Sequence, residues 1–381
     1  MKNLLLLLSL FIATSAVADN VHVANRADWM QNLRDDVFVS DLCLPGAHDA
    51  ASGQTHVYGT SVQTKTINEL FDAGVRVFDF RTAIPSSYMP LRMYHNFVDL
   101  ARTFSGVMDD LYSKLDDHPS EFCVVIIKCE GMRDKPHEVY PLFRSYFRHS
   151  YDEDIRLYKS HETGDGQGED DWGLNFNHKY WKNDEAGYNY AKNKWAKFSA
   201  DMRVGYARGK VILLFRNSYN YDDPYNPMAG PLLGSFTSNP EIQYMPWGNF
   251  MCQDAYHEDD MEWNMEYKFK RYVKPCCEKL TYEINRGNRV WCVNHLSGYT
   301  NQPAAPNSAV LARTTNRVFA KYLAENPDVN TGMVMMDYAG EGTSWGYTVS
   351  GDLALEAVIH QNWRYWKDTE DPQGHVEVNS N

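Results

Sequence analysis

The sequence contains the stretch Cys123-Val124-Val125-Ile126-Ile127-Lys128-Cys129-Glu130, an apolar run that ends on charged residues. A continuous run of this length, rich in β-branched residues, is typical of a strand buried on both faces of a parallel sheet. A second stretch, Lys210-Val211-Ile212-Leu213-Leu214-Phe215-Arg216, has the same form. Both stretches predict buried strands that place a charged side chain at the carboxyl end.

Six further short apolar runs bring the number of predicted strands to eight. They span residues 37–44, 75–81, 91–95, 250–254, 290–295 and 333–337. Helical patterns lie between several of these strands. They cover residues 66–73, 100–115, 308–323 and 352–366. Strands and helices that alternate in this way indicate an α/β fold with a parallel barrel.

Each predicted strand ends in a polar or charged group. These groups are His48, Arg81, His95, Lys128, Arg216, Asp254, His295 and Asp337. A single histidine of this kind is more often structural than catalytic, whereas eight polar strand ends in series are hard to attribute to chance. Because the active sites of parallel barrels lie at the carboxyl ends of the strands, we expect these side chains to meet at one mouth.

The two ends of the chain and one internal segment differ from the barrel pattern. Residues 1–18 combine a lysine, a short apolar run and a small-residue triplet, which predicts a secretory signal peptide and export, to the periplasm or out of the cell. Residues 150–200, rich in Asp, Asn, Gly and aromatic residues, are predicted to be a surface insertion in a single domain of residues 19–367. Residues 368–381 are predicted to be a disordered tail.

Composition narrows the possible partners. The formal net charge is −13, which argues against nucleic acid because phosphate backbones are bound by clustered Lys and Arg. The seven cysteines match no zinc-binding spacing. An exported protein can hold a disulfide, but Cys276 and Cys277 are adjacent and poorly placed to bond each other.

Several motifs follow one another along the chain. They are Leu44-Pro45-Gly46-Ala47-His48-Asp49, Gly74-Val75-Arg76-Val77-Phe78-Asp79-Phe80-Arg81, Tyr94-His95, Pro119-Ser120-Glu121, Ala207-Arg208-Gly209-Lys210, Gln253-Asp254-Ala255-Tyr256 and Met336-Asp337-Tyr338. With them the sequence resembles the metal-independent bacterial phosphatidylinositol-specific phospholipase C family. Ala47 and Asn96 depart from the residues usual in the family, but neither change removes a reactive group. The resemblance implies a distorted (βα)8 TIM-type barrel.

The resemblance also implies an intramolecular reaction without a cofactor. The inositol 2-hydroxyl attacks the phosphorus, which releases diacylglycerol and leaves an inositol cyclic phosphate. His48 would be the general base, oriented by Asp337. His95 would be the general acid, with Asp49 supporting its protonated form. Arg81 would bind the non-bridging phosphoryl oxygens, since its planar fork suits phosphate.

By the same resemblance, five further residues would surround the inositol ring. They are Asp79, Lys128, Arg216, Asp254 and Tyr256. Asp79 and Lys128 can in addition form an ion pair across neighbouring strands. The partner implied is an inositol phospholipid at a membrane surface, bound transiently by a peripheral monomer. His295 matches no role in the family and is interpreted as structural.

The expected chemistry needs no metal, and two other functions stay open. Related calcium-dependent phospholipases carry an acidic residue where Arg81 stands and asparagine where Asp49 stands, so a guanidinium here occupies the place of the cation. A glycerophosphodiester phosphodiesterase would need an acidic metal-binding pair, of which Asp79-Phe80-Arg81 supplies one carboxylate. A non-catalytic inositol- or sugar-binding barrel would not need both histidines, both partner aspartates and the arginine.

Overall fold

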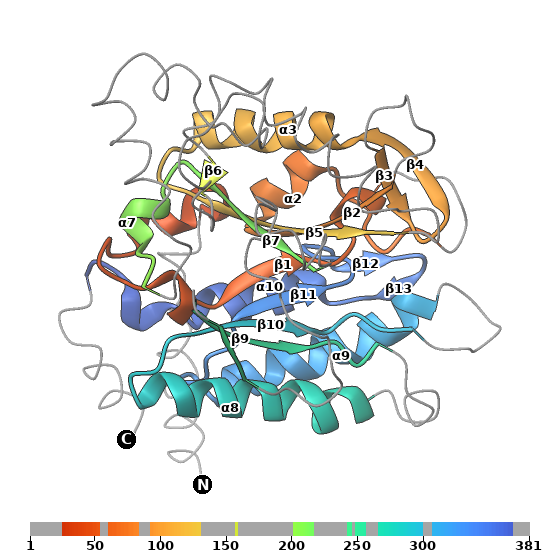
Figure 1. The fold of residues 1–381 in the computed structure, drawn as a ribbon. Helices are drawn as coiled ribbons and strands as arrows, with labels where there is room; N and C mark the ends of the chain where they lie inside the picture. The colour runs from red at the N-terminus through yellow and green to blue at the C-terminus, as the bar shows by residue number, and fades with distance from the viewer. Residues whose placement is uncertain are drawn as a thin grey trace, which may run out of the picture.

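The computed structural model describes residues 25–53, 60–83, 92–130, 157–158, 201–216, 242–245, 248–256, 266–299 and 307–368 (Figure 1). The predicted signal peptide lies outside these ranges, as does the predicted tail beyond its first residue. Of the predicted surface insertion at residues 150–200, only Leu157–Tyr158 is described.

A parallel sheet forms the centre of the molecule. Its main strands are β1 (Leu44–Ala47), β2 (Val77–Ala83), β5 (Cys123–Cys129), β7 (Val211–Phe215), β9 (Gly248–Gln253), β10 (Val290–His295) and β11 (Met333–Met336). They lie in the order β7-β5-β2-β1-β11-β10-β9, and each neighbouring pair is parallel. This order follows the chain around the sheet and places the last strand beside the first. The predicted α/β fold, with the strand order of a TIM-type barrel, is therefore confirmed.

The third predicted strand is not part of the parallel set, so the prediction of eight equivalent parallel strands is wrong at this point. β3 (Arg92–His95) pairs antiparallel with β2 and with β4 (Val98–Thr103). The reason is the length of the connection. β2 ends at Ala83 and β3 begins at Arg92, whereas a parallel connection needs a crossover of about a dozen residues or more.

Short elements border the parallel strands. β6 (Leu157–Tyr158) pairs parallel with β7, and β8 (Gln243–Met245) pairs antiparallel with β9. The first predicted strand is shorter than expected, because Val39–Asp41 form a 3-10 helix and β1 begins only at Leu44. Because β6 comes from the 150–200 segment, the described part of that segment contributes to the sheet itself.

Helices cover the sheet on two sides. They are α2 (Ile67–Ala73), α3 (Phe104–Asp117), α7 (Val204–Ala207), α8 (Lys274–Asn285), α9 (Asn307–Glu325) and α10 (Gly351–His360). Figure 1 shows α2 and α3 on one side of the strands and α8 and α9 on the other. The four predicted helical segments are confirmed as α2, α3, α9 and α10, with two corrections. The helix predicted from residue 100 begins only at Phe104, because residues 100–103 belong to β4, and α10 ends at His360. None of the helices described could cross a bilayer, given their length and polarity.

The helix ends follow local sequence signals. At the start of α2, Thr66 and Glu69 form a reciprocal capping box, in which each side chain accepts a hydrogen bond from the backbone N–H of the other. The helix ends at Gly74, whose φ of +110° lies in the left-handed region that favours glycine. This turn leads the chain directly into β2.

A buried ion pair lies at the amino ends of β2 and β5. Arg76, just before β2, donates to Glu121 Oε2 from Nε at 3.0 Å and from Nη2 at 2.7 Å. Its Nη1 donates to the carbonyls of Phe71 and Val75, so the buried charge is well hydrogen-bonded. Because Arg76 and Glu121 precede β2 and β5, they lie at the opposite end of these strands from the reactive groups. Their contribution is structural.

Candidate active site

The carboxyl ends of the strands bring together side chains that are far apart in the sequence. They are His48 and Asp49 after β1, Asp79 and Arg81 on β2, His95 at the end of β3, Lys128 on β5, Arg216 after β7, Asp254 after β9 and Asp337 after β11. One hydrogen-bonded chain connects six of them. It runs Asp337–His48–Arg81–Asp79–Asp49–His95.

His48 is held at both ring nitrogens. Its Nδ1 lies 2.8 Å from Asp337 Oδ1, and its Nε2 lies 2.7 Å from Arg81 Nη2. A guanidinium can only donate, so Nε2 must accept and the ring proton must sit on Nδ1, where the carboxylate accepts it. This arrangement defines a neutral imidazole whose Nε2 lone pair accepts the hydrogen bond from Arg81 and is the atom that can act as a base once a substrate takes up the guanidinium donor.

Arg81 is fixed by two carboxylates. Its Nε and Nη2 donate to Asp79 Oδ2 at 3.2 and 3.1 Å, and its Nη1 donates to Glu130 Oε1 at 2.7 Å. Asp79 and Arg81 are two residues apart on β2, so their side chains leave the same face of the strand. Burial alone would lower the pKa of Arg81, but the charges of Asp79, Asp49 and Glu130 outweigh it and raise that pKa. The guanidinium is therefore a permanent cation with a defined orientation.

His95 contacts Asp49 through Nδ1 and Oδ2. Burial lowers the pKa of His95, but the hydrogen bond and the charge of Asp49 outweigh it, so the net effect is a raised pKa. The backbone of Asp49 has a φ of +44° and turns the chain directly after His48, which lets these neighbours reach different partners. The two histidines therefore differ in their environment: His48 accepts from a cation, whereas His95 is favoured in its charged form.

A second polar group lies beside the first. Arg216 Nη2 donates to Asp254 Oδ2 at 2.6 Å, and both side chains are largely buried. Burial would raise the pKa of Asp254, but the positive charges of Arg216 and Lys268 help to lower it below its usual range. Arg216 also lowers the pKa of buried Asp79 together with Arg81, which ties the two groups electrostatically. Tyr256 follows Asp254 by two residues, and its side chain is exposed.

Lys128 has a different partner from the one considered in the sequence. It donates to Glu130 Oε1 at 2.8 Å, the same oxygen that accepts from Arg81, and not to Asp79. Burial raises the pKa of Glu130, but Arg81 and Lys128 lower it to about 2. Sequence reasoning missed Glu130, although it follows Lys128 by two residues and therefore points to the same side of the strand.

The sequence placed His295 among the strand ends at the mouth but gave it no role, and it did not single out Lys268. His295 Nδ1 lies 3.1 Å from Ser297 Oγ and 3.7 Å from Asp254 Oδ1, and its ring meets the His48 ring edge-on at 5.9 Å between centroids. Burial lowers the pKa of His295 to about 3, so the ring is neutral. Lys268 is fully buried and donates to the carbonyl of Ser297. No pattern in the sequence marks Lys268, since a lysine is rarely buried.

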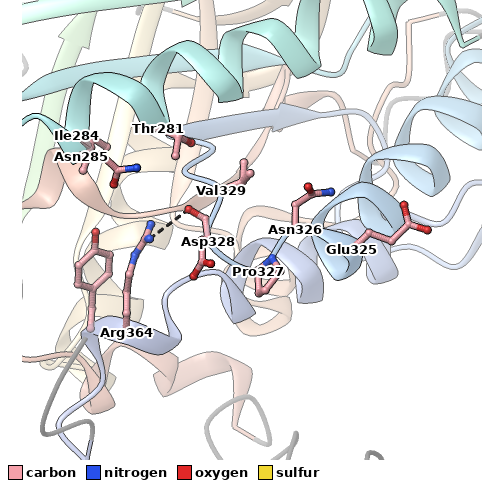
Figure 2. A pocket seen from close by; sticks show the side chains of 10 residues that line it. Thr281, Ile284, Asn285, Glu325, Asn326, Pro327, Asp328, Val329 and Arg364 are labelled. Carbon is pink, nitrogen blue, oxygen red and sulfur yellow. Dashed lines mark hydrogen bonds between the residues drawn. The ribbon is translucent and has the colours of Figure 1, made fainter. Parts of the chain in front are cut away.

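An open surface hollow lies elsewhere on the molecule. Figure 2 shows it between the end of α8, the end of α9 and the residues after α10, with Arg364 donating to the carbonyl of Asp328 at 3.2 Å. Because α8 and α9 end just before β10 and β11 begin, this hollow lies at the amino ends of those strands. It is therefore separate from the two histidines.

The described side chains include no cluster of three or more His, Cys, Asp and Glu residues arranged to hold a metal ion. At the centre of the polar network stands Arg81, surrounded by carboxylates. What the network offers is thus a fixed cation beside a neutral imidazole, with a second imidazole that favours its charged form.

Comparison with known proteins finds bacterial 1-phosphatidylinositol phosphodiesterases among the relatives of this chain. No family model matches the chain. The chain is 23% identical over 351 residues to a 1-phosphatidylinositol phosphodiesterase of Staphylococcus aureus (strain Newman), which covers 88% of this chain and 94% of the relative. A protein of the same name from Listeria monocytogenes is 26% identical over 131 residues, or 32% of this chain and 40% of the relative.

Solved structures share the fold. A variant of the phosphatidylinositol-specific phospholipase C from Staphylococcus aureus matches with a TM-score of 0.63 at 20% identity, over 88% of this chain and 97% of that chain. The phosphatidylinositol-specific phospholipase C from Listeria monocytogenes matches with a TM-score of 0.56 at 18% identity, over 89% and 99%. The chain thus has the fold of the bacterial phosphatidylinositol-specific phospholipases C and is similar to them in sequence.

Proposed function

We propose that this protein is a phosphatidylinositol-specific phospholipase C, which cleaves an inositol phospholipid into diacylglycerol and an inositol cyclic phosphate. The observation that carries the proposal is the hydrogen-bonded chain that joins two histidines, their two partner aspartates and an arginine, with Asp79 as the link between Arg81 and Asp49. Similarity over most of the chain to proteins named for this activity supports it.

The first step uses the neutral imidazole. His48 Nε2 takes the proton of the inositol 2-hydroxyl, whose oxygen then forms a bond to the phosphorus. Asp337 accepts from Nδ1 and stabilises the imidazolium as the proton arrives. Because Arg81 contacts the same Nε2, a phosphoryl oxygen bound by the guanidinium lies beside the base.

The second step uses the charged imidazole. His95 gives a proton to the glycerol oxygen as its bond to phosphorus breaks, so that diacylglycerol leaves as a neutral alcohol. Arg81 balances the negative charge that gathers on the non-bridging oxygens, which is the role a metal ion has in other phosphodiesterases. We propose that no metal takes part.

The remaining polar residues suit a polyol. Arg216 and Asp254 offer a donor and an acceptor side by side, and Asp79 and Lys128 lie on the neighbouring strands β2 and β5. We propose that inositol hydroxyls bind between these groups and that the exposed ring of Tyr256 stacks on the sugar. The substrate class follows from this abundance of hydroxyl partners close to a phosphate site.

Exposed aromatic side chains fit a lipid surface. Phe97, in the turn directly after His95, is 82% exposed, and Trp345, between β12 (Thr343–Ser344) and β13 (Tyr347–Thr348), is 53% exposed. We propose that an exported, monomeric protein docks peripherally on the membrane that holds its substrate. A solved relative from Staphylococcus aureus is described in terms of its membrane binding.

Product identification tests the proposed function. The protein is incubated with phosphatidylinositol vesicles in one sample and with glycerophosphoinositol in another, and phosphorus NMR follows the products. An inositol cyclic phosphate formed from the lipid is expected. Glycerol phosphate released from the second substrate would favour a glycerophosphodiesterase, and binding of inositol without turnover would favour the non-catalytic barrel.

Neutralising the polyol site is expected to weaken inhibition by free inositol. Arg216→Gln and Asp254→Asn each remove one charged hydrogen-bonding partner, which should raise the inhibition constant about 10-fold or more. Glu278→Gln, on the exposed face of α8, is the matched control. If both site variants keep the inhibition constant of the unchanged protein, the polyol binds elsewhere.

Asp49→Asn is expected to move the alkaline limb of the pH–rate profile to lower pH. His95 must be protonated to act as the acid, and Asp49 raises its pKa, so activity persists to a higher pH than an ordinary histidine would allow. The neutral amide removes that charge, and His95 then loses its proton earlier as the pH rises. The limb is read from kcat/KM between neutral and alkaline pH, with the surface variant Asp72→Asn as control. An unmoved limb would contradict the role of Asp49.

A further inference from the structure

Helix α8 and strand β10 face each other through two cysteines. Cys276 on α8 and Cys292 on β10 have their Sγ atoms 3.6 Å apart, and both side chains are buried. We propose that Cys276 and Cys292 form a disulfide bond in the exported protein. The bond would join the helix on one side of the sheet to the strand that carries His295.

The geometry allows this bond with little movement. The Sγ atoms must approach by about 1.5 Å to reach a disulfide length of about 2.05 Å. The bond would close a short loop that contains most of α8 and the start of β10. Closing a loop restricts the unfolded chain, so the bond should stabilise the fold.

The other described thiols have different neighbours. Cys277 Sγ accepts a hydrogen bond from Asn294 Nδ2 at 3.2 Å, and Cys43 Sγ accepts one from the backbone N–H of Thr331 at 3.3 Å. Cys276 and Cys292 are the one pair of described cysteines whose sulfur atoms are in contact. The structure therefore favours the pair Cys276 and Cys292. The sequence does not suggest this pair, because Cys276 stands next to Cys277.

The reaction is a thiol–disulfide exchange. Both thiols lose a proton and together give two electrons to the disulfide of an oxidant, such as glutathione disulfide or a thiol oxidase of the export route, which leaves as two thiols. Contact with Cys292 and burial raise the pKa of Cys276, so the folded protein forms little of the reactive thiolate. The bond therefore forms before α8 packs on the sheet, and afterwards the same burial protects it from reductants.

Differential alkylation tests the pairing. The full chain is refolded in a mixture of glutathione and glutathione disulfide, denatured, labelled with iodoacetamide, then reduced and labelled with N-ethylmaleimide. Of the seven cysteines, only Cys276 and Cys292 are expected to carry the second label when the peptides are mapped by mass spectrometry. The first label on all seven, or the second label on another pair, would overturn the proposal.

Thermal unfolding gives a second readout. Protein refolded with the glutathione pair is expected to melt higher than protein refolded and kept in reductant, by about 5 °C. The difference should vanish in the double variant Cys276→Ala, Cys292→Ala and persist in Cys123→Ala, which removes a buried thiol on β5. A difference that survives in the double variant would show that the bond lies elsewhere.

Discussion

Replacing His48 or His95 by alanine is expected to reduce kcat by about 10²–10⁴-fold or more while the protein stays folded. Each substitution removes one proton transfer, and the two histidines have separate carboxylate partners, Asp337 and Asp49. His48→Ala also removes the acceptor of one Arg81 hydrogen bond, whereas the two bonds of Arg81 to Asp79 remain. Loss of activity should therefore reflect chemistry more than collapse of the site.

The measurement is initial turnover of phosphatidylinositol vesicles, together with circular dichroism to confirm folding. His360→Ala on α10 is the matched control, because His360 is partly exposed and its neighbour is a surface glutamate. The double variant His48→Ala, His95→Ala is expected to lose much less activity than the product of the two single losses. The reason is that groups that act in one transition state are not independent. Near-normal turnover in either folded single variant would end the assignment of acid and base.

Arg81→Lys is expected to lose most of the rate, by about 10²–10³-fold. Lysine keeps the positive charge, but its ammonium is a point charge and cannot present two parallel donors to the phosphoryl oxygens. It also cannot span Asp79 and Glu130 as the guanidinium does, with three donor atoms directed at the two carboxylates. Geometry, rather than charge alone, is what this substitution removes.

Two companion measurements separate a guanidinium mechanism from a metal mechanism. The unchanged protein should keep its activity after thorough treatment with EDTA, and Arg81→Asp should have no turnover without metal. Arg286→Lys, at the exposed end of α8, is the control for an arginine-to-lysine change. Strong inhibition of the unchanged protein by EDTA, reversed by calcium, would replace the proposed mechanism with a metal-dependent one.

The placement of most candidate residues could be read from the sequence because it depends on local pattern. Buried parallel strands are continuous apolar runs, so the residue that ends each run is visible without a structure. His48, Arg216, Asp254 and Asp337 lie at strand ends for this reason. The two ends of α2 also depend on local sequence, since Thr66 and Glu69 cap its start and Gly74 its end.

Other features depend on contacts between distant segments. The run that ends at His95 has the pattern of a strand, but only its short connection to β2 makes it antiparallel. The register of β5 against β2 sets Lys128 beside Arg81. Glu130 follows Lys128 by two residues, so the same register brings Glu130 into the site. Lys268 and His295 meet only in the folded protein, where Ser297 after β10 contacts both side chains.

The sequence alone thus determined the fold class and the strand ends, because buried strands and helix caps are specified by neighbouring residues. Tertiary structure alone decided which side chains from distant segments meet: Arg81 with His48 and Glu130, and the sulfur atom of Cys276 with that of Cys292. The physical reason is that hydrogen bonds and ion pairs act over a few ångströms between atoms whose separation is set by strand register and helix packing. The spacing of two residues along the chain does not specify how far apart their atoms lie when the residues come from distant segments.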